Sequence, residues 1–435
     1  MVFNAQQLEA DLTASRRESL ADLLPEQYVL PRYGGRCIAN LPPTIGHLLG
    51  VERGWVGPPL EQELWAGLGD GVERVVFLLV DGVGWRRLWQ VVAQQDAQLL
   101  PLLHSWGASI FPITTISPAT TSVATTTLWG NGALPAEHGM LGYSFLLGEH
   151  SALSNMLFWK PVGRGEGGYG ELLKWDIKPE TFLPTPSIAQ VLAKQRVTTT
   201  SIIPQAITKS PLSRMQMREA KIYGYLNDTD LWLNLRFWLK ESSGKRAYCY
   251  LYYPDFDTFS HRDGPDAMSW VALWHSFRFH WARLMSDLSA QARKKTLLIV
   301  SADHGHVFSP VTKRYLLRDQ PALTRHFSLM SGGEPRHSYI YARPGHKEAI
   351  RDYYDAHLAD HFHLLEAADA LQAGLYGSTT RPHPDAERRI GEFVLLSKGG
   401  YTLWHQTPKK SLLGMHGSLE PEEMIVPFIA MRLDN

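Results

Sequence analysis

Short runs of apolar residues recur along the chain, and most of them end at a polar or glycine-containing loop. The run at 75–80 holds six apolar residues and ends at Asp81 and Gly82. It is too short for an apolar helix and is typical of a strand buried on both faces of a parallel sheet. Comparable runs predict further strands at 107–111, 197–203, 247–253, 296–300, 338–342 and 393–396.

Apolar residues spaced three or four positions apart predict helices between these strands. The clearest stripe, within about 265–293, contains Trp270, Leu273, Trp274 and Phe277, and we expect it to face the core. Further helices are predicted near the N-terminus and at 44–49, 187–195, 230–241, 347–359 and 364–371. This alternation predicts an α/β fold, with a mostly parallel central sheet sandwiched by helices.

The length and composition fit one large domain with insertions. The chain has 435 residues, of which 44% are hydrophobic and 20% are charged, as in an ordinary globular protein with a substantial core. Residues 1–435 are predicted to form a single domain, with residues 1–70 as an N-terminal extension packed on the core. Cap or insertion segments are expected at about 145–245 and 325–390. The glycine-rich stretch at 162–170 is typical of a substrate-facing lid.

Charge and cysteine content narrow the class of partner. Lys+Arg and Asp+Glu both number 43, and the resulting zero net charge argues against nucleic acid as an obligate partner. Cys37 and Cys249 are far apart in sequence and are expected to be reduced core residues. The N-terminus lacks a signal-peptide pattern, and no apolar run approaches the ~20 residues that span a bilayer. We therefore expect a cytoplasmic enzyme with no membrane partner.

Side chains that can bind metals stand at four strand ends or post-strand loops. They are Asp81; Asp257 with His261; Asp303 with His304; and His416. Carboxylate and imidazole together suit zinc, or manganese where oxygen donors dominate. Any one of these residues alone is more often a helix cap or a surface histidine. Their recurrence at four strand ends favours a shared metal site.

A dense run of threonine and serine residues follows the second predicted strand, at 116–127. Pro118 suits the first turn of a helix, where its missing N–H is not needed. Hydroxyl groups beside the amides of a helix start form a site suited to an anion.

Five short motifs, in order along the chain, resemble those of a known family. They are Val80-Asp81-Gly82; the threonine-rich helix start followed by Pro135-Ala136-Glu137-His138-Gly139; Asp257-Thr258-Phe259-Ser260-His261 with Gly264-Pro265; Asp303-His304-Gly305; and His416-Gly417. Together they resemble the alkaline phosphatase superfamily, and most closely its type I phosphodiesterase/nucleotide pyrophosphatase branch. The resemblance spans residues 80 to 417, which is most of the chain.

The resemblance implies an alkaline phosphatase-like core with inserted cap segments and a site that holds two divalent metal ions, Zn²⁺ or Mn²⁺. One ion would be held by Asp81, Asp303, His304 and the nucleophile, and the other by Asp257, His261 and His416. The family nucleophile is a threonine a short distance before the Pro-x-x-His-Gly element. Counting back from that element points to Thr121, with Ser122 and Thr120 as the alternatives.

The implied activity is hydrolysis of phosphodiester or pyrophosphate bonds in small, nucleotide-like substrates, through a threonine phosphoenzyme. One alternative is a phosphomonoesterase or phosphonate hydrolase of the same superfamily, and another is a catalytically silent metal-binding protein. Ala124 stands where the branch usually has an asparagine, and Ser260 stands where it has a glycine. His306 and Asp255 match no family ligand, so a supporting role is expected for both.

Overall fold

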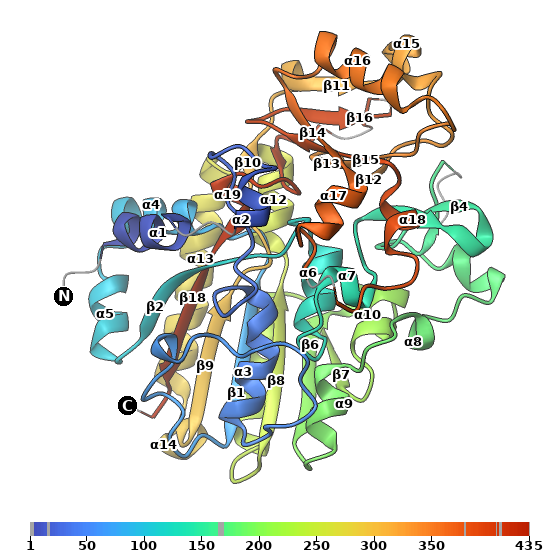
Figure 1. Ribbon diagram of the computed structural model, residues 1–435. Helices are drawn as coiled ribbons and strands as arrows, with labels where there is room; N and C mark the ends of the chain where they lie inside the picture. The colour runs from blue at the N-terminus through green and yellow to red at the C-terminus, as the bar shows by residue number, and fades with distance from the viewer. Residues whose placement is uncertain are drawn as a thin grey trace.

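The apolar run at 75–80 forms β1 (Arg74–Val80), a strand that is buried along its whole length. The structure is a computed structural model that describes residues 4–14, 18–163, 169–377, 380–405, 407–408 and 411–434. β1 lies in a seven-stranded sheet of the order β2-β18-β9-β1-β8-β6-β7 (Figure 1). The other strands are β2 (Ser109–Thr114), β6 (Thr198–Pro204), β7 (Lys221–Tyr225), β8 (Ala247–Tyr253), β9 (Thr296–Ser301) and β18 (Ile425–Arg432).

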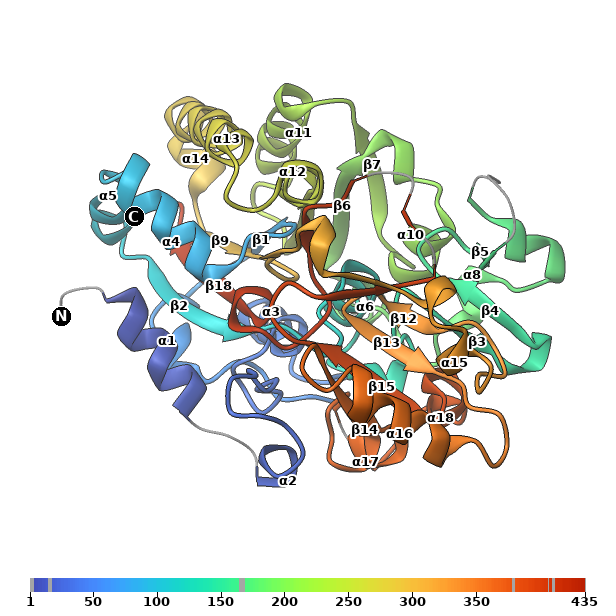
Figure 2. The ribbon, with the colours of Figure 1, turned by 90° about the horizontal axis from the view of Figure 1, so that it is seen from above.

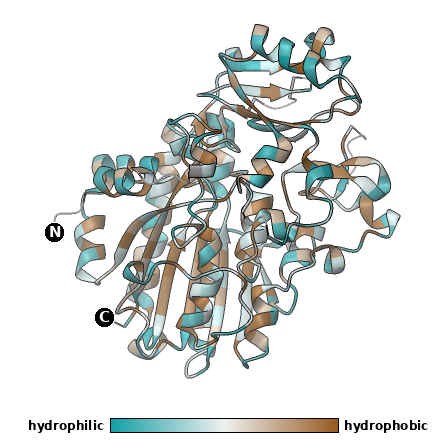
Figure 3. Cartoon of the chain, in the orientation of Figure 1, coloured by the Kyte–Doolittle hydropathy of each residue, from teal (hydrophilic) through white to brown (hydrophobic). Residues whose placement is uncertain are grey.

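Five neighbouring strands of this central sheet run parallel, from β9 to β7. β18 runs antiparallel to both of its neighbours, β2 and β9. The strands are among the most hydrophobic segments of the chain (Figure 3), as expected for strands covered on both faces. The predicted α/β fold with a mostly parallel central sheet is confirmed.

Helices cover both faces of the central sheet. α4 (Trp85–Gln95), α11 (Asp228–Glu241) and α13 (Met268–Asp287) lie on one face, and α3 (Leu41–Leu48) and α6 (Thr121–Leu128) lie on the other (Figure 2). Among the residues that the structure describes, no helix combines the length and apolar character needed to cross a bilayer.

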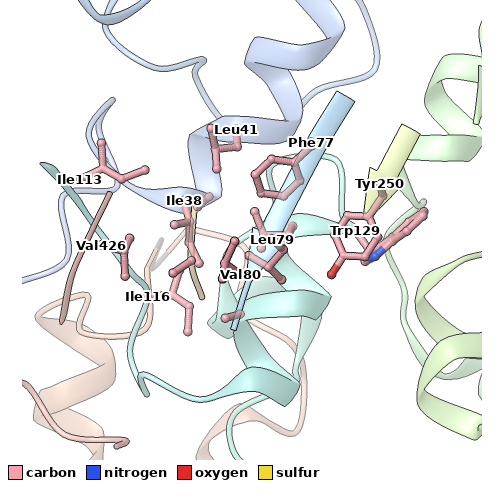
Figure 4. Close-up of a cluster of buried hydrophobic side chains, with 14 of the residues drawn as sticks. Ile38, Leu41, Phe77, Leu79, Val80, Ile113, Ile116, Trp129, Tyr250 and Val426 are labelled. Carbon is pink, nitrogen blue, oxygen red and sulfur yellow. The ribbon is translucent and has the colours of Figure 1, made fainter. Parts of the chain in front are cut away.

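Residues from the N-terminal segment contribute directly to the core. Ile38 and Leu41 pack with Phe77 and Leu79 of β1 in one buried cluster (Figure 4). Cys37 and Cys249 are both buried, and neither forms a disulfide, as expected for core residues.

A second seven-stranded sheet, antiparallel throughout, lies beyond the carboxyl ends of the parallel strands (Figure 1). We call it the cap sheet. Its strands are β14 (Phe362–Glu366), β15 (Phe393–Ser397), β13 (His337–Ile340), β12 (Gly332–Glu334), β3 (Ser144–Leu147), β4 (Ala152–Asn155) and β5 (Lys160–Pro161). Of the segment 145–245, β4 and β5 lie in the cap sheet, whereas β6 and β7 lie in the central sheet.

The remaining elements are short. Two small sheets pair β10 (Val307–Phe308) with β17 (Gly414–Met415) and β11 (Arg314–Leu316) with β16 (Thr402–Trp404). The remaining α-helices are α1 (Ala5–Ala14), α2 (Glu18–Ala21), α5 (Leu99–Ser105), α7 (Pro135–His138), α8 (Pro179–Phe182), α9 (Ile188–Ala193), α10 (Pro211–Gln216), α12 (Asp255–Asp263), α14 (Ala290–Arg293), α15 (Pro321–Thr324), α16 (Lys347–His357), α17 (Ala367–Gln372), α18 (Ala386–Ile390) and α19 (Pro421–Met424).

Three predicted elements differ from the structure. The helix predicted at 265–293 is interrupted: α13 ends at Asp287, and the Ser289 side chain caps a new helix, α14. The helix predicted at 364–371 begins as strand β14, because 362–366 pairs with β15, and becomes helical at Ala367. The helix expected to start at Pro118 begins at Thr121, after Thr120 as its extended N-cap. Part of the predicted lid, residues 164–168, lies outside the described residues.

Candidate metal centre

One cluster of possible metal ligands forms where β1 and β9 end side by side. Asp81 follows β1, and Asp303 and His304 follow β9. One donor atom from each of the three lies within 4.8 Å of the others. Nε2 of His304 is 3.5 Å from Oδ1 of Asp81 and 3.6 Å from Oδ2 of Asp303. Neighbouring parallel strands place their carboxyl ends at one edge of a sheet, which accounts for this meeting.

The threonine-rich helix α6 begins at the same cluster. The hydroxyl of Thr121 lies 3.1 Å from Nε2 of His304. Ser122 instead donates its hydroxyl to the carbonyl of Gly142, and the Thr120 hydroxyl hydrogen-bonds to Glu334. Of the three candidate nucleophiles, Thr121 is therefore the one whose hydroxyl adjoins the first cluster.

A second cluster contains Asp257, His261, His306 and His416, again with one donor atom from each within 4.8 Å of the others. Oδ1 of Asp257 lies 3.2 Å from Nε2 of His261, 3.1 Å from Nε2 of His306 and 3.8 Å from Nε2 of His416. The rings of His304 and His416 stack, with centroids 3.6 Å apart. The two clusters therefore adjoin, and the six metal-binding side chains predicted from the sequence all lie in one of them, with the Thr121 hydroxyl beside the first.

Helix α12 gives Asp257 and His261 their common direction. It begins directly after β8, and the i, i+4 spacing places both side chains on one face of the helix. Phe256, which is fully buried, packs against Trp270 of α13 with ring centroids 4.7 Å apart. This anchor turns one side of α12 into the core and leaves Asp257 and His261 facing the cluster.

The four histidines share one orientation. In each of them Nδ1 lies within hydrogen-bond distance of a backbone carbonyl: Gly414 for His261 at 2.7 Å, Gly305 for His304 at 3.1 Å, Gly82 for His306 at 3.3 Å and Ala119 for His416 at 2.9 Å. A carbonyl only accepts, so Nδ1 carries the proton and Nε2 presents its lone pair to the cluster. This is the arrangement found in metal-binding histidines.

The buried atoms at the centre lack the partners that protein groups normally supply. Oδ1 of Asp81, Oδ2 of Asp303, Oδ1 of Asp257 and Nε2 of His306 are buried and have no hydrogen-bond partner among the described residues. Buried polar atoms are otherwise almost always paired. A divalent cation in each cluster would complete all four atoms. The carboxylate and imidazole donors fit zinc or manganese.

The electrostatics of the clusters also fit a bound cation. Burial, together with the carboxylates of Asp303 and Asp257, raises the pKa of Asp81 well above its ordinary value. For Asp257, burial raises the pKa, but His261 and His306 outweigh it and hold the pKa well below the usual range. Burial and the neighbouring imidazoles of His304 and His261 lower the pKa of His416. A dication would favour the deprotonated form of every one of these groups.

Further contacts hold the first cluster in place. Oδ1 of Asp303 accepts hydrogen bonds from the amides of Gly82 and His304, both at 3.1 Å, so that Oδ2 remains available. The hydroxyl of Tyr252, near the end of β8, donates to Oδ2 of Asp81 and leaves Oδ1 available. Each aspartate thus has one oxygen committed to the protein and one directed at the cluster.

Three residues of the site, His306, Tyr252 and Glu334, are not among the site residues predicted from the sequence. His306 lies two residues after His304, but it matches no family ligand, so the sequence predicts only a supporting role for it. Tyr252 precedes the last residue of a predicted strand, and strand-end position was its one available signal. Glu334 gave no signal, because it belongs to β12 of the cap sheet and reaches Thr120 only through the fold. Burial raises the pKa of Glu334 to about 8.

The two departures from the family motif are both buried. Ala124 is fully buried in α6, and Ser260 is fully buried in α12. Ala124 has no polar side-chain atom, so it cannot donate a hydrogen bond to a bound phosphoryl group as an asparagine at this position could.

Comparison with known proteins agrees with the fold and the motifs. Murine ectonucleotide pyrophosphatase/phosphodiesterase 5, solved as an inactive variant in complex with AMP, is 16% identical, with a TM-score of 0.61 over 82% of this chain and 88% of the other. The human protein of the same name gives 16% and 0.60 over 82% and 87%. Phosphonoacetate hydrolase from Sinorhizobium meliloti 1021, in complex with phosphonoformate, gives 15% and 0.56 over 82% and 89%.

At these identities the likeness is one of fold. A search of curated proteins found no match to the sequence. The model of one family, type I phosphodiesterase/nucleotide pyrophosphatase, matches residues 75–419. This match covers both clusters and the helix between them, and the chain belongs to the type I phosphodiesterase/nucleotide pyrophosphatase family.

Proposed function

We propose that this protein is a binuclear metal-dependent hydrolase that cleaves phosphodiester or pyrophosphate bonds of nucleotide-like substrates. The observation that carries the proposal is the placement of the Thr121 hydroxyl 3.1 Å from Nε2 of His304, where the two ligand clusters adjoin. A hydroxyl between two sites for dications is the arrangement that phosphoryl transfer requires.

The proposed ligands follow from the two clusters. Asp81, Asp303, His304 and Thr121 would hold one ion, and Asp257, His261 and His416 would hold the other. When bound, the two dications would lower the pKa of the threonine hydroxyl and neutralise negative charge on the phosphoryl and leaving oxygens.

The residues of this chain then define the covalent steps. Oγ1 of Thr121 gives up its proton to solvent and forms a bond to phosphorus, while the bond from phosphorus to the leaving oxygen breaks and the electron pair passes to that oxygen, which takes up a proton from solvent. The first-turn amides of α6 lie beside Thr121 and would hold the non-bridging oxygens. A water molecule then attacks from the opposite side, the bond between phosphorus and Oγ1 breaks with its electron pair passing to Oγ1, and a proton from the water passes to Oγ1. The threonine hydroxyl is restored.

A small cavity beside Thr121 supports an organic group on the phosphate. It measures about 60 Å³, and its lining includes Thr121, Gln216, Tyr250 and Tyr252. Aliphatic and aromatic side chains, with several hydroxyl groups and one amide, line it, which suits a largely apolar organic group attached to phosphorus by an ester, as in a diester. A structural neighbour was solved with AMP, which supports a nucleotide-like substrate.

The second candidate function is hydrolysis of phosphomonoesters or phosphonates. The similarity of fold to phosphonoacetate hydrolase supports it, as does the loss at Ala124 of a side-chain contact to the phosphoryl group.

The test is hydrolysis of bis-p-nitrophenyl phosphate, p-nitrophenyl phosphate and phosphonoacetate by the zinc- or manganese-loaded protein. We expect the diester to be cleaved fastest and Thr121→Ala to lower that rate by about a thousandfold or more, because no other group replaces the nucleophile. Ser122→Ala is the matched control, since its hydroxyl points to Gly142, and it should keep most of the activity.

Each other outcome points to an alternative. Equal rates for the wild type and Thr121→Ala would remove Thr121 as the nucleophile. Preference for the monoester or for phosphonoacetate would favour the second candidate function. A protein that binds two metal ions but hydrolyses none of the three substrates would be a catalytically silent metal-binding protein.

A further inference from the structure

We propose that His306 is a fourth protein ligand of the second metal ion, beside Asp257, His261 and His416. The family motif supplies only the other three, so this ligand would be an addition to the motif. The inference rests on the proposed function in one respect: it requires that the second cluster hold a metal ion.

The first observation is the geometry of the three rings. The ring centroids of His261, His306 and His416 lie 5.1, 5.1 and 5.2 Å from one another, so they form a nearly equilateral triangle. The His306 ring stands almost perpendicular to the His261 ring, at 89°, and to the His416 ring, at 82°. Three imidazoles in this arrangement surround one point, which Oδ1 of Asp257 also faces.

The second observation concerns Nε2 of His306. It lies 3.1 Å from Oδ1 of Asp257, yet both atoms are buried without a hydrogen-bond partner among the described residues. Because the proton of the His306 ring is on Nδ1, directed at the carbonyl of Gly82, Nε2 presents a lone pair and has no proton to donate to Oδ1 of Asp257. A cation placed between them and the other two imidazoles would satisfy both.

The third observation is that the fold makes room for this ring. Nδ1 of His306 lies 3.3 Å from the carbonyl of Gly82, so its proton is held there, as in the three histidines of the motif. Gly82 has a positive φ of 78°, and a Cβ at this position would lie 2.6 Å from Cε1 of His306. Glycine at position 82 thus allows the His306 ring to enter the second cluster.

A fourth protein ligand changes the character of the second site. Three ligands leave one tetrahedral position open, whereas with four protein ligands a substrate oxygen would enter as a fifth ligand. Three imidazoles and one carboxylate favour zinc or cobalt over manganese and magnesium, which prefer oxygen donors. We therefore expect the second site to hold zinc more tightly than the first, in which the protein atoms supply a single nitrogen.

The alternative is that His306 is structural and only positions Asp257. Asparagine distinguishes the two roles, because its amide can donate to the Gly82 carbonyl as Nδ1 does but places no donor atom at the position of Nε2. Glutamine has the reverse character, since its amide oxygen can approach the position of Nε2. A structural histidine would be replaced best by asparagine, and a ligand best by glutamine.

The experiment compares the wild type, His306→Asn, His306→Gln and His275→Asn, which removes an exposed histidine of α13 as the control. Zinc per chain is measured by mass spectrometry after equilibrium dialysis at several concentrations of free zinc. The visible absorption of the cobalt-loaded proteins reports the coordination of the ion. Thermal unfolding of the metal-free proteins detects damage to the fold that is independent of the metal.

We expect His306→Asn to weaken zinc binding at one of two sites by at least about tenfold and to change the cobalt spectrum. We expect His306→Gln to lose less and His275→Asn to behave as the wild type. Wild-type affinity for two zinc ions and an unchanged cobalt spectrum in His306→Asn would overturn the inference and leave the proposed function intact. A wild-type protein that binds no zinc or cobalt would overturn the proposed function as well.

Discussion

His138 illustrates a buried histidine whose two ring nitrogens are both satisfied by the protein. Nε2 lies 3.0 Å from the hydroxyl of Thr127, which itself donates to the carbonyl of Val123, so the ring donates this bond. Nδ1 accepts from the amide of Met140 at 3.1 Å. The site histidines differ, because in each of them one nitrogen is bound and the other faces the cluster. This contrast separates a structural histidine from a candidate ligand.

This environment predicts an effect of pH on stability. Burial, aided by His383 and Arg389, lowers the pKa of His138 from 6.5 to about 3. Below pH 6.5 the His138 imidazole therefore binds a proton in the unfolded chain but not in the folded chain. The free energy of unfolding falls as the pH falls from 6.5 towards 3. In His138→Gln this contribution disappears, so its free energy of unfolding should change less steeply by up to about 1.4 kcal/mol per pH unit.

Urea unfolding of both proteins between pH 7 and pH 4 measures the difference. If the free energy of unfolding depended on pH with the same slope in the wild type and in His138→Gln over this range, the lowered pKa of His138 would be contradicted.

At the residue scale, most of the candidate ligands could be predicted from the sequence, because strand ends are easy to recognise. The predicted ligands all lie in the two clusters, although their role as ligands remains a prediction. Which hydroxyl is the nucleophile depends on where α6 begins, and the sequence alone did not decide among Thr120, Thr121 and Ser122. Rotation by one helical position moves a hydroxyl by about 100°, and only the structure decides which of the three adjoins His304.

At the scale of elements, one buried ion pair connects the cap sheet with the loop that carries His416. Arg336, beside β13, binds Glu423 of α19 through two hydrogen bonds of 2.7 and 2.8 Å, and both side chains are fully buried. Oε1 of Glu423 also accepts a hydrogen bond from the amide of Ser418, two residues after His416. The pair therefore connects the cap to the second cluster.

Arg336→Met should leave the Glu423 carboxylate buried without its counter-charge and lower the free energy of unfolding by about 3–5 kcal/mol. The matched control is Arg283→Met, which breaks an exposed pair with Asp287 on α13 and should cost less than about 1 kcal/mol. Urea unfolding measures both. Equal losses in the two variants would refute a special role for the buried pair.

β1, β8 and β9 of the central sheet could be predicted because each contains a continuous apolar run, whereas the edge strand β7 could not, because its sequence, KIYGY, alternates and is only partly buried. Two strands of the cap sheet, β13 and β15, correspond to predicted strands, but the sheet itself could not be predicted, because its pairings join distant segments, such as Ser144 of β3 with Gly333 of β12. Its strands are also short, and period alone does not separate the start of β14 from a helix. The break between α13 and α14 follows from a local cap at Ser289, which competes with a strong apolar stripe.

At the scale of the whole molecule, the proposed metal ions join segments that are remote in sequence. The proposed ligands lie between residues 81 and 416, on helices α6 and α12 and in the loops after β1, β9 and β17. Without cations, burial and the neighbouring carboxylates of Asp303 and Asp257 disfavour the charged form of Asp81 and raise its pKa.

Removal of metal by a chelator should therefore lower the melting temperature. A ligand at one hundred times its Kd stabilises the folded state by about 2.7 kcal/mol, so the shift should be several degrees and should reverse on addition of zinc. Scanning calorimetry with and without chelator measures it. An unchanged melting temperature, after metal analysis has confirmed that the ions are gone, would show that they do not stabilise the fold.

The position of β18 has a consequence for synthesis on the ribosome. Residues 425–432 lie between β2 and β9, whose segments are made more than three hundred and one hundred residues earlier, respectively. Until residue 432 has left the exit tunnel, β2 has no neighbour in the central sheet, and the edge of β9 that β18 will cover remains open. During this interval the residues of β2 and β9 that pair with β18 in the folded protein lack their partner strand, so the central sheet is completed late in synthesis.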